Sequence, residues 1–190
     1  MIYFAHPTRY LAYHHAYAIG ASMMPLKDKV GLNDEHLKAI GLVAVHWAFI
    51  ENILSSIIWS IAHLRHTRGI AITTHLSERS RQDICNALAH ETFRGHSEEK
   101  ELKDHLHYIF ETLYPQRNKI VHATWGYSAT SGASDILPIK ARGKVTIGPR
   151  ESLAPEDIIN IAEEIEAAVF KLDAIRGKIS QLLPTLSGWP

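Results

Sequence analysis

Apolar residues recur at intervals of three and four along most of the chain, the spacing that places them on one face of an α-helix. The clearest case begins after Asn33 or Asp34, either of which can serve as an N-cap. Its apolar positions are Leu37, Ile40, Val43, Ala44, Trp47, Ile50, Leu54, Ile57, Ile58 and Ile61. This pattern predicts a long and mostly buried helix.

Weaker patterns predict a helix on each side of the long one. A short helix is expected over residues 10–24 and ends at Pro25. A second is expected to open at Ser77, with Ile84, Leu88 and Phe93 facing inward.

The second half of the chain predicts two more helices. One starts at Ser97 and carries the stripe Leu102, Leu106, Ile109, Phe110 and Leu113. Pro115 lies inside this pattern and removes a backbone donor, which predicts a kink just ahead of Arg117, with helical spacing resuming through Thr124. Pro155, at a favourable first position, starts a last long helix.

Between these two helices the pattern is not helical. Small and polar residues from 127 to 135 predict a loop, and two short strands are expected around Arg142-Gly143. The predicted fold is therefore all-α: one domain over residues 1–190, an antiparallel helical bundle with a small β-hairpin insertion near 136–148.

Composition narrows the possible partners. Among 190 residues, Lys plus Arg and Asp plus Glu number 20 each, so the net charge is zero and any RNA contact should be a local patch. A single cysteine, Cys85, excludes an internal disulfide framework and fits the cytoplasm. The N-terminus lacks the pattern of a signal peptide. His46, Glu51 and Asn52 interrupt the longest apolar stretch, so no membrane partner is expected.

The candidate chemistry lies in the hexapeptide Arg117-Asn118-Lys119-Ile120-Val121-His122. Arginine is always protonated and can fork onto phosphate oxygens, while histidine gives and takes protons near neutral pH. These groups can serve RNA cleavage without a metal. His122 would then act as general base or acid, Arg117 would hold the phosphate, and Asn118 would orient His122 or the phosphate.

The hexapeptide resembles the Arg-x4-His signature of the HEPN superfamily, in its Arg-Asn-x3-His form. The resemblance implies a helical domain that acts as a metal-independent endoribonuclease and builds its site across a homodimer. It also implies a toxin or a defence or stress nuclease, with an antitoxin or inhibitor protein as a partner. Ala123, where glycine often follows the histidine, and the hairpin depart from the family pattern.

The helix geometry bears on the oligomeric state. Arg117 and His122 are five residues apart and diverge by roughly 140° around a helix, so a homodimer would relax the demand that both meet one phosphate.

Glu51 falls on the apolar stripe of the long helix, where an unpaired carboxylate is costly. Arg117 is its best partner in the sequence, either as a purely structural pair or as support for catalysis.

The remaining candidates have two interpretations each. Arg79 and Arg81 would either supply a phosphate-binding patch or lie as solvated charges at helix ends. Trp125 would either stack on a base or pack at the end of its helix. Lys119 is a further candidate for substrate binding. The 13 histidines do not combine with carboxylates at metal-site spacing, so neither a metal nor any other cofactor is expected.

Two functions remain open from the sequence. The first is the RNA-cleaving enzyme. The second is a catalytically silent helical module for dimerisation, nucleotide binding or protein binding, in which Arg117, Glu51 and His122 form a buried polar network.

Overall fold

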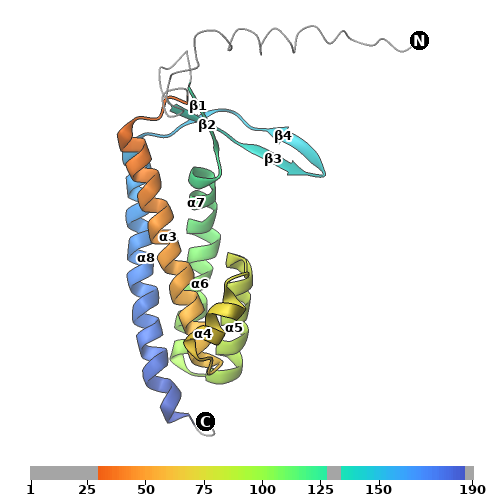
Figure 1. Cartoon of the computed structure of the whole chain (residues 1–190), viewed down its shortest axis with the longest axis vertical. Coiled ribbons are helices and arrows are strands. Elements are labelled where there is room, and N and C mark those ends of the chain that lie inside the picture. Colours follow the sequence, from red (N-terminus) through yellow and green to blue (C-terminus); the bar gives the residue numbers. More distant parts are fainter. Residues whose placement is uncertain (1–29, 128–133, 187–190) are drawn as a thin grey trace, which may run out of the picture.

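The computed structural model describes residues 30–127 and 134–186 (Figure 1). Its helices are α3 (Asp34–Ile61), α4 (His66–Thr73), α5 (Glu78–Phe93), α6 (Ser97–Tyr108), the π-helix η1 (Ile109–Leu113), α7 (Tyr114–Val121), α8 (Pro155–Leu182) and the 3-10 helix η2 (Leu183–Thr185). The strands are β1 (Thr124–Tyr127), β2 (Ser134–Leu137), β3 (Ile139–Arg142), β4 (Lys144–Ile147) and β5 (Glu151–Ser152). The helix expected over residues 10–24 lies outside the described residues.

The two longest helices, α3 and α8, lie side by side and run in the same direction. Imidazole N–H groups tie them together at two heights, from His36 Nε2 to the Leu153 carbonyl at 3.1 Å and from His46 Nδ1 to the Ala162 carbonyl at 2.9 Å. The continuous rod of α6, η1 and α7 runs in the opposite direction (Figure 1). The mostly helical fold with a small β insertion agrees with the sequence, but the antiparallel arrangement is wrong for this longest pair.

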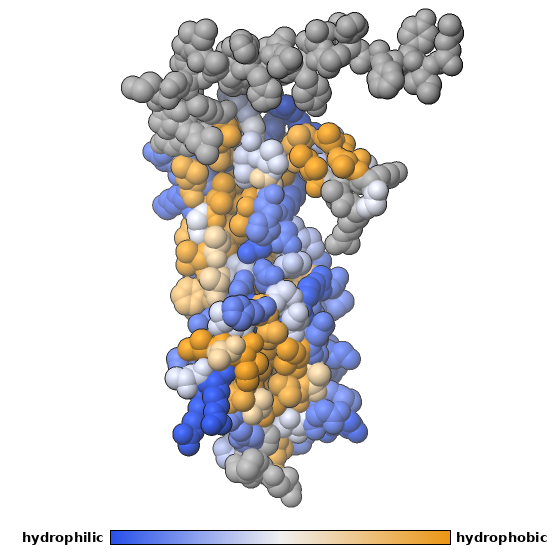
Figure 2. All heavy atoms as spheres, turned by 45° about the vertical axis from the view of Figure 1, so that its right-hand side comes forward, coloured by the Kyte–Doolittle hydropathy of each residue, from blue (hydrophilic) through white to orange (hydrophobic). Residues whose placement is uncertain are grey.

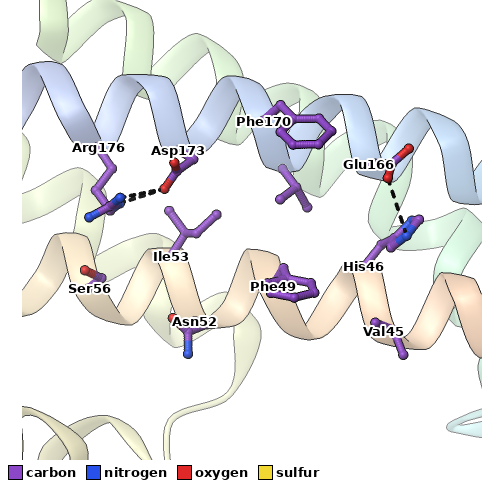
Figure 3. Close-up of a pocket in the computed structure, with 11 residues that line it drawn as sticks. Val45, His46, Phe49, Asn52, Ile53, Ser56, Glu166, Phe170, Asp173 and Arg176 are labelled. Atoms are coloured by element: carbon purple, nitrogen blue, oxygen red, sulfur yellow. Dashed lines mark hydrogen bonds and ion pairs between the residues drawn. The ribbon is translucent and has the colours of Figure 1, made fainter.

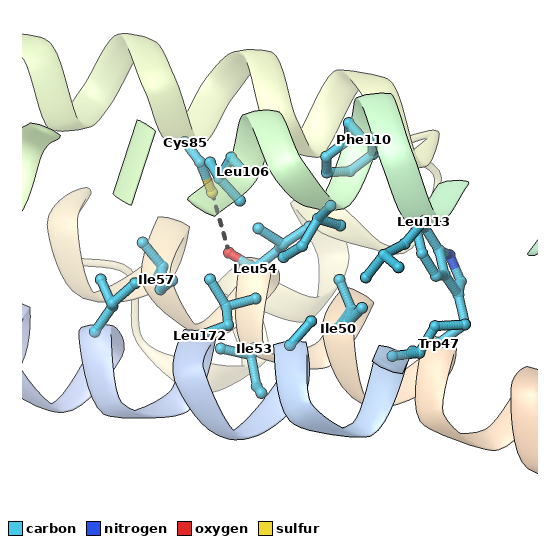
Figure 4. Packing of buried hydrophobic residues seen from close by; sticks show 14 of the residues in the cluster. Trp47, Ile50, Ile53, Leu54, Ile57, Cys85, Leu106, Phe110, Leu113 and Leu172 are labelled. Atoms are coloured by element: carbon cyan, nitrogen blue, oxygen red, sulfur yellow. Dashed lines mark hydrogen bonds between the residues drawn. The ribbon is translucent and has the colours of Figure 1, made fainter. Parts of the chain in front are cut away.

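The core is formed where α3 meets α8, α5 and the α6–α7 rod. Figure 4 shows large apolar side chains of α3 packed against those of the rod and of α8; fully buried members include Trp47, Ile50, Leu54, Ile57, Leu106, Phe110, Leu113 and Leu172. By length and composition α3 could cross a membrane, but its apolar face is packed inside this core, as in the central helix of a folded domain. The expectation of a mostly buried first helix holds only in part: seven of its ten predicted apolar positions are buried, whereas Leu37 and Ala44 are exposed.

Helix α5 is rotated relative to its predicted orientation. Ser77 caps it as expected, accepting a hydrogen bond from the Ser80 N–H. The buried side chains of α5 are Arg81, Cys85, Ala89 and Phe93, whereas Ile84 and Leu88 are only half-buried. The Cys85 thiol donates to the Leu54 carbonyl, and burial raises the pKa of this thiol to about 12.

The predicted kink ahead of Arg117 corresponds to a change of helix type. Residues Ile109–Leu113 form a π-helical turn immediately before Pro115, which lies in the first turn of α7. Helix α7 then ends at Val121, so Thr124 belongs to strand β1 and not to the helix as predicted.

The β insertion is larger than the predicted hairpin. Strands β3 and β4 form that hairpin, with Ile139 opposite Ile147 and Gly143 in the turn at a φ of +75°. A separate antiparallel sheet has the order β1-β2-β5, so Ile136 and Leu137 pair with β1, and strands begin and end the segment predicted as a loop. The hairpin projects from the helical body as an arm (Figure 1), and apolar side chains gather on it (Figure 2); Ile139, Val145 and Ile147 are exposed.

Candidate active site at the end of helix α7

Arg117, Asn118 and His122 meet at the C-terminal end of α7. The Arg117 guanidinium donates from Nη1 to Asn118 Oδ1 at 2.8 Å and to His122 Nε2 at 2.7 Å. The 140° divergence does not keep the two residues apart, because His122 is the C-cap of α7 (φ −108°, ψ 7°) and the long arginine side chain curls toward it. One chain therefore brings the cation and the imidazole together without the homodimer that would have relaxed this demand.

Arg117 is also contacted by groups that are distant in the sequence. Its Nη1 lies 3.7 Å from Glu78 Oε1, at the start of α5, and its guanidinium lies 5.6 Å from the centre of the Trp47 ring on α3. Only 12% of its side chain is exposed, whereas His122 is exposed. The arginine is thus held in place, and the histidine remains accessible to a substrate.

Glu51 has a different partner from the one predicted. Its Oε2 lies 3.5 Å from Arg81 Nη1, and Arg117 acts on it only as a nearby positive charge. Burial raises the pKa of Glu51; the Arg81 charge opposes this rise, Glu78 adds to it and Arg117 opposes it. The predicted pair of Glu51 with Arg117 is therefore wrong, although both residues belong to one charged cluster.

Arg81 does not lie beside a substrate surface. Its side chain is buried and donates from Nε to Ser55 Oγ at 3.2 Å and from Nη2 to the Thr73 carbonyl at 3.0 Å. With Glu51 as its third contact, Arg81 joins α3, α4 and α5. Its neighbour Arg79 is paired with Glu111 at 2.8 Å, so these two arginines do not form the phosphate-binding patch that was one of their two interpretations.

Trp125 and Lys119 flank the hexapeptide in different ways. The Trp125 indole N–H donates to the Ile120 carbonyl at 3.1 Å, and its half-buried ring meets the edge of His36 at 6.2 Å. This is the packing role that the sequence left open for Trp125. Lys119 is exposed and its ammonium contacts the Glu151 carboxylate on β5.

A pocket of about 510 Å³ opens beside His122. Asn118, Lys119, His122, Thr124 and Glu151 supply its polar groups. The rest of its wall comes from Pro115, Ala123 and the chain leading into the hairpin arm, Ile136, Leu137, Pro138 and Ile139. The β insertion, to which the sequence assigned no role, therefore completes the surroundings of the candidate catalytic histidine.

A second pocket, of about 590 Å³, lies between α3 and α8 and faces away from the hexapeptide. Phe49, which lines it, is two positions before Glu51 and so points in a direction about 200° away around α3. Figure 3 shows Phe49 and Phe170 from the two helices in this groove, with the His46–Glu166 contact (3.9 Å) at one end and the Asp173–Arg176 pair (2.8 Å) at the other. Nothing in the hexapeptide reaches this groove.

Among residues 30–127 and 134–186, the structure does not bring three His, Cys, Asp or Glu side chains together in a cluster that could hold a metal ion. Two acidic residues of the candidate site were missed by the sequence argument. Glu78 reads as an ordinary acidic residue in a helix first turn, and Glu151 lies in a two-residue strand without a recognisable pattern. Only tertiary packing brings them to Arg117 and Lys119.

No protein-family model, curated protein or solved structure matches this chain.

Proposed function

We propose that this protein is a metal-independent endoribonuclease whose catalytic groups are Arg117, Asn118 and His122. The observation that carries the proposal is the 2.7 Å contact between Arg117 Nη1 and His122 Nε2 at the edge of an open pocket. A fixed cation next to an exposed imidazole supplies the charge and the proton acceptor that transfer within a phosphodiester requires.

The direction of this hydrogen bond defines the starting state of the histidine. Arginine can only donate, so Nε2 must accept, and the imidazole must be neutral with its proton on Nδ1. His122 is therefore arranged as a base. When a phosphate binds, its oxygens take over the Arg117 donor and Nε2 becomes free to accept a proton.

The reaction then proceeds in one displacement. The ribose 2′-hydroxyl loses its proton to His122 Nε2 as its oxygen attacks phosphorus, and the bond from phosphorus to the 5′-oxygen breaks. The imidazolium returns the proton to the departing 5′-oxygen. Arg117 neutralises the charge on the phosphate oxygens, and Asn118 keeps the arginine turned toward His122. The products are a 2′,3′-cyclic phosphate and a 5′-hydroxyl.

The test of this proposal is an analysis of cleavage products with chelator present. RNA incubated with the purified protein and EDTA should be cut and should carry these two termini. A substrate with one 2′-deoxy sugar at the scissile position should resist. Inhibition by EDTA, or products with 3′-hydroxyl ends, would contradict the mechanism.

The biological setting is also a proposal: a cytoplasmic toxin or a defence or stress nuclease, restrained by an antitoxin or inhibitor protein. An exposed ribonuclease site would need such restraint in a cell. Neutral net charge agrees with a local RNA contact and not with a generally basic surface.

A homodimer belongs to the same proposal, but the structure supports a different surface from the motif helix. The groove between α3 and α8 exposes 55% of Phe49 and 68% of Phe170, and Glu166 and Arg176 lie at its opposite ends. If a second copy packs here with its α8 antiparallel, Glu166 of each copy faces Arg176 of the other around a shared aromatic centre. The groove is thus complementary to itself, as an isologous interface must be.

A second candidate function is the catalytically silent module. The 12% exposure of Arg117 and its pairing with Glu78 favour it, because a buried arginine also serves structure alone. In that case the folded protein would cut no RNA under any condition.

A further inference from the structure

The pocket beside His122 has one apolar wall and one charged edge. The wall consists of Pro115 and of the segment Ile136–Ile139 at the base of the hairpin arm. A flat, weakly polar ring can lie against such a wall, and a volume of about 510 Å³ has room for a nucleobase with its ribose.

The charged edge is formed by Lys119 and Glu151. The ammonium of Lys119 contacts Glu151 Oε2, and both side chains are partly exposed and line the pocket. Together they present a donor next to two carboxylate acceptors. Exposed ion pairs of this kind add little to stability, so this pair can open and each side chain can contact a ligand instead.

This order of groups is complemented most fully by one base. The Watson–Crick edge of guanine presents an acceptor, O6, followed by two donors, N1–H and the exocyclic N2 amine. Adenine and cytosine present no donor pair to a carboxylate, and uracil has a single ring N–H between two carbonyls. Unpaired bases of RNA are recognised on these edges by side chains of this type.

We propose that this pocket binds a guanine base, with Glu151 accepting from N1–H and N2 and Lys119 donating to O6. The inference rests on the proposed ribonuclease function in one respect: the bound base is taken to belong to the nucleotide whose ribose carries the attacking 2′-hydroxyl. His122 lines the same pocket, so a base held there places its own sugar next to the imidazole. Cleavage should then follow unpaired guanosines.

The first arm of the test measures binding without cleavage. Guanosine, adenosine, cytidine and uridine 3′-monophosphates, which contain no phosphodiester, are titrated into the protein by calorimetry. We expect guanosine monophosphate to bind about tenfold more tightly than the others, the discrimination typical of one bidentate contact. Glu151→Gln should abolish this preference, whereas Glu156→Gln, an exposed carboxylate outside the pocket, should keep it.

The second arm identifies the source of the base. A uridine heptamer with one central 2′-deoxyguanosine should bind more tightly than the free nucleotide if RNA is the ligand, and no more tightly if the pocket serves free guanine nucleotides. Equal affinity for all four nucleotides, or a preference that survives Glu151→Gln in a protein with unchanged circular dichroism, overturns the assignment. Guanine-selective binding without RNA cleavage would support the guanine pocket and contradict the ribonuclease function. RNA cleavage without guanine preference would support the ribonuclease function and contradict the guanine pocket.

Discussion

Glu78 and Arg117 form an ion pair with an N–O distance of 3.7 Å that joins the start of α5 to α7. The Arg117 Nη1 that lies near this carboxylate also donates to Asn118 and His122. We therefore expect Glu78 to position the arginine in the proposed site. It also adds to the raised pKa of Glu51.

Replacing Glu78 tests this positioning role. Glu78→Gln should keep the fold and lower the rate of RNA cleavage by about tenfold, because Arg117 loses the charge that holds it. The same variant should lower the pKa of Glu51, measured by NMR titration, since a neighbouring negative charge has been removed. Glu163→Gln on the exposed face of α8 is the control. Unchanged cleavage together with an unchanged Glu51 titration would show that Glu78 does not act in this cluster.

Much of the fold follows from local sequence signals. Asn33 caps α3 and Pro155 starts α8 as predicted, because capping and proline geometry depend only on nearby residues. The β1-β2-β5 sheet was not predicted, because β5 has only two residues and pairs with β2 across the whole hairpin arm. Their pairing depends on strands that are distant in the chain.

In the candidate site, too, features set by neighbouring residues were predicted and features set by distant residues were not. Arg117, Asn118 and His122 are neighbours in the sequence, and their chemistry indicated a site before any geometry was known. The partner of Glu51 was not predictable, because Arg81 and Arg117 lie on different helices and only the packing of α5 against α3 selects between them. The helical wheel also failed for His122, because it assumes that the helix continues to a residue that in fact ends it.

Glu51 offers a test of stability and pH. Glu51→Ala should lower the free energy of unfolding at pH 7 by about 1–3 kcal/mol, since buried Arg81 loses its carboxylate. Glu51→Gln should cost less than Glu51→Ala, because the raised pKa means that the fold favours the neutral form of this side chain. Urea unfolding of both variants measures these differences. A larger loss for Gln than for Ala would contradict this interpretation.

The sign of the pH effect follows from the same shift. The folded protein holds a proton on Glu51 more tightly than the unfolded chain, whose pKa is near 4.5. The stabilisation from this proton is complete below the unfolded pKa and is lost as the pH rises through the folded pKa. The stability of wild type relative to Glu51→Gln should therefore fall as the pH is raised from 4 toward 7. A rise over the same range would contradict the direction of the shift.

The proposed dimer surface is tested by the aromatic residues of the α3–α8 groove. Light scattering should show a dimer for wild type and a monomer for Phe170→Asp, because a charge at the centre of an apolar interface cannot be accommodated. Val145→Asp is a matched control, since this equally exposed apolar residue lies on the hairpin arm. A monomeric wild-type protein would contradict the proposed dimer. If only Val145→Asp produced a monomer, the interface would lie on the hairpin arm and not in the groove.

The most direct test of the central claim compares two histidines on RNA. His122→Ala and His107→Ala both remove an exposed imidazole, but only His122 contacts Arg117. Both variants should keep the circular-dichroism spectrum and melting temperature of wild type. We expect His107→Ala to cleave RNA at the wild-type rate and His122→Ala to lose cleavage by at least about 100-fold, within the range of one general acid–base group. Undiminished cleavage by a folded His122→Ala protein would contradict the proposed mechanism.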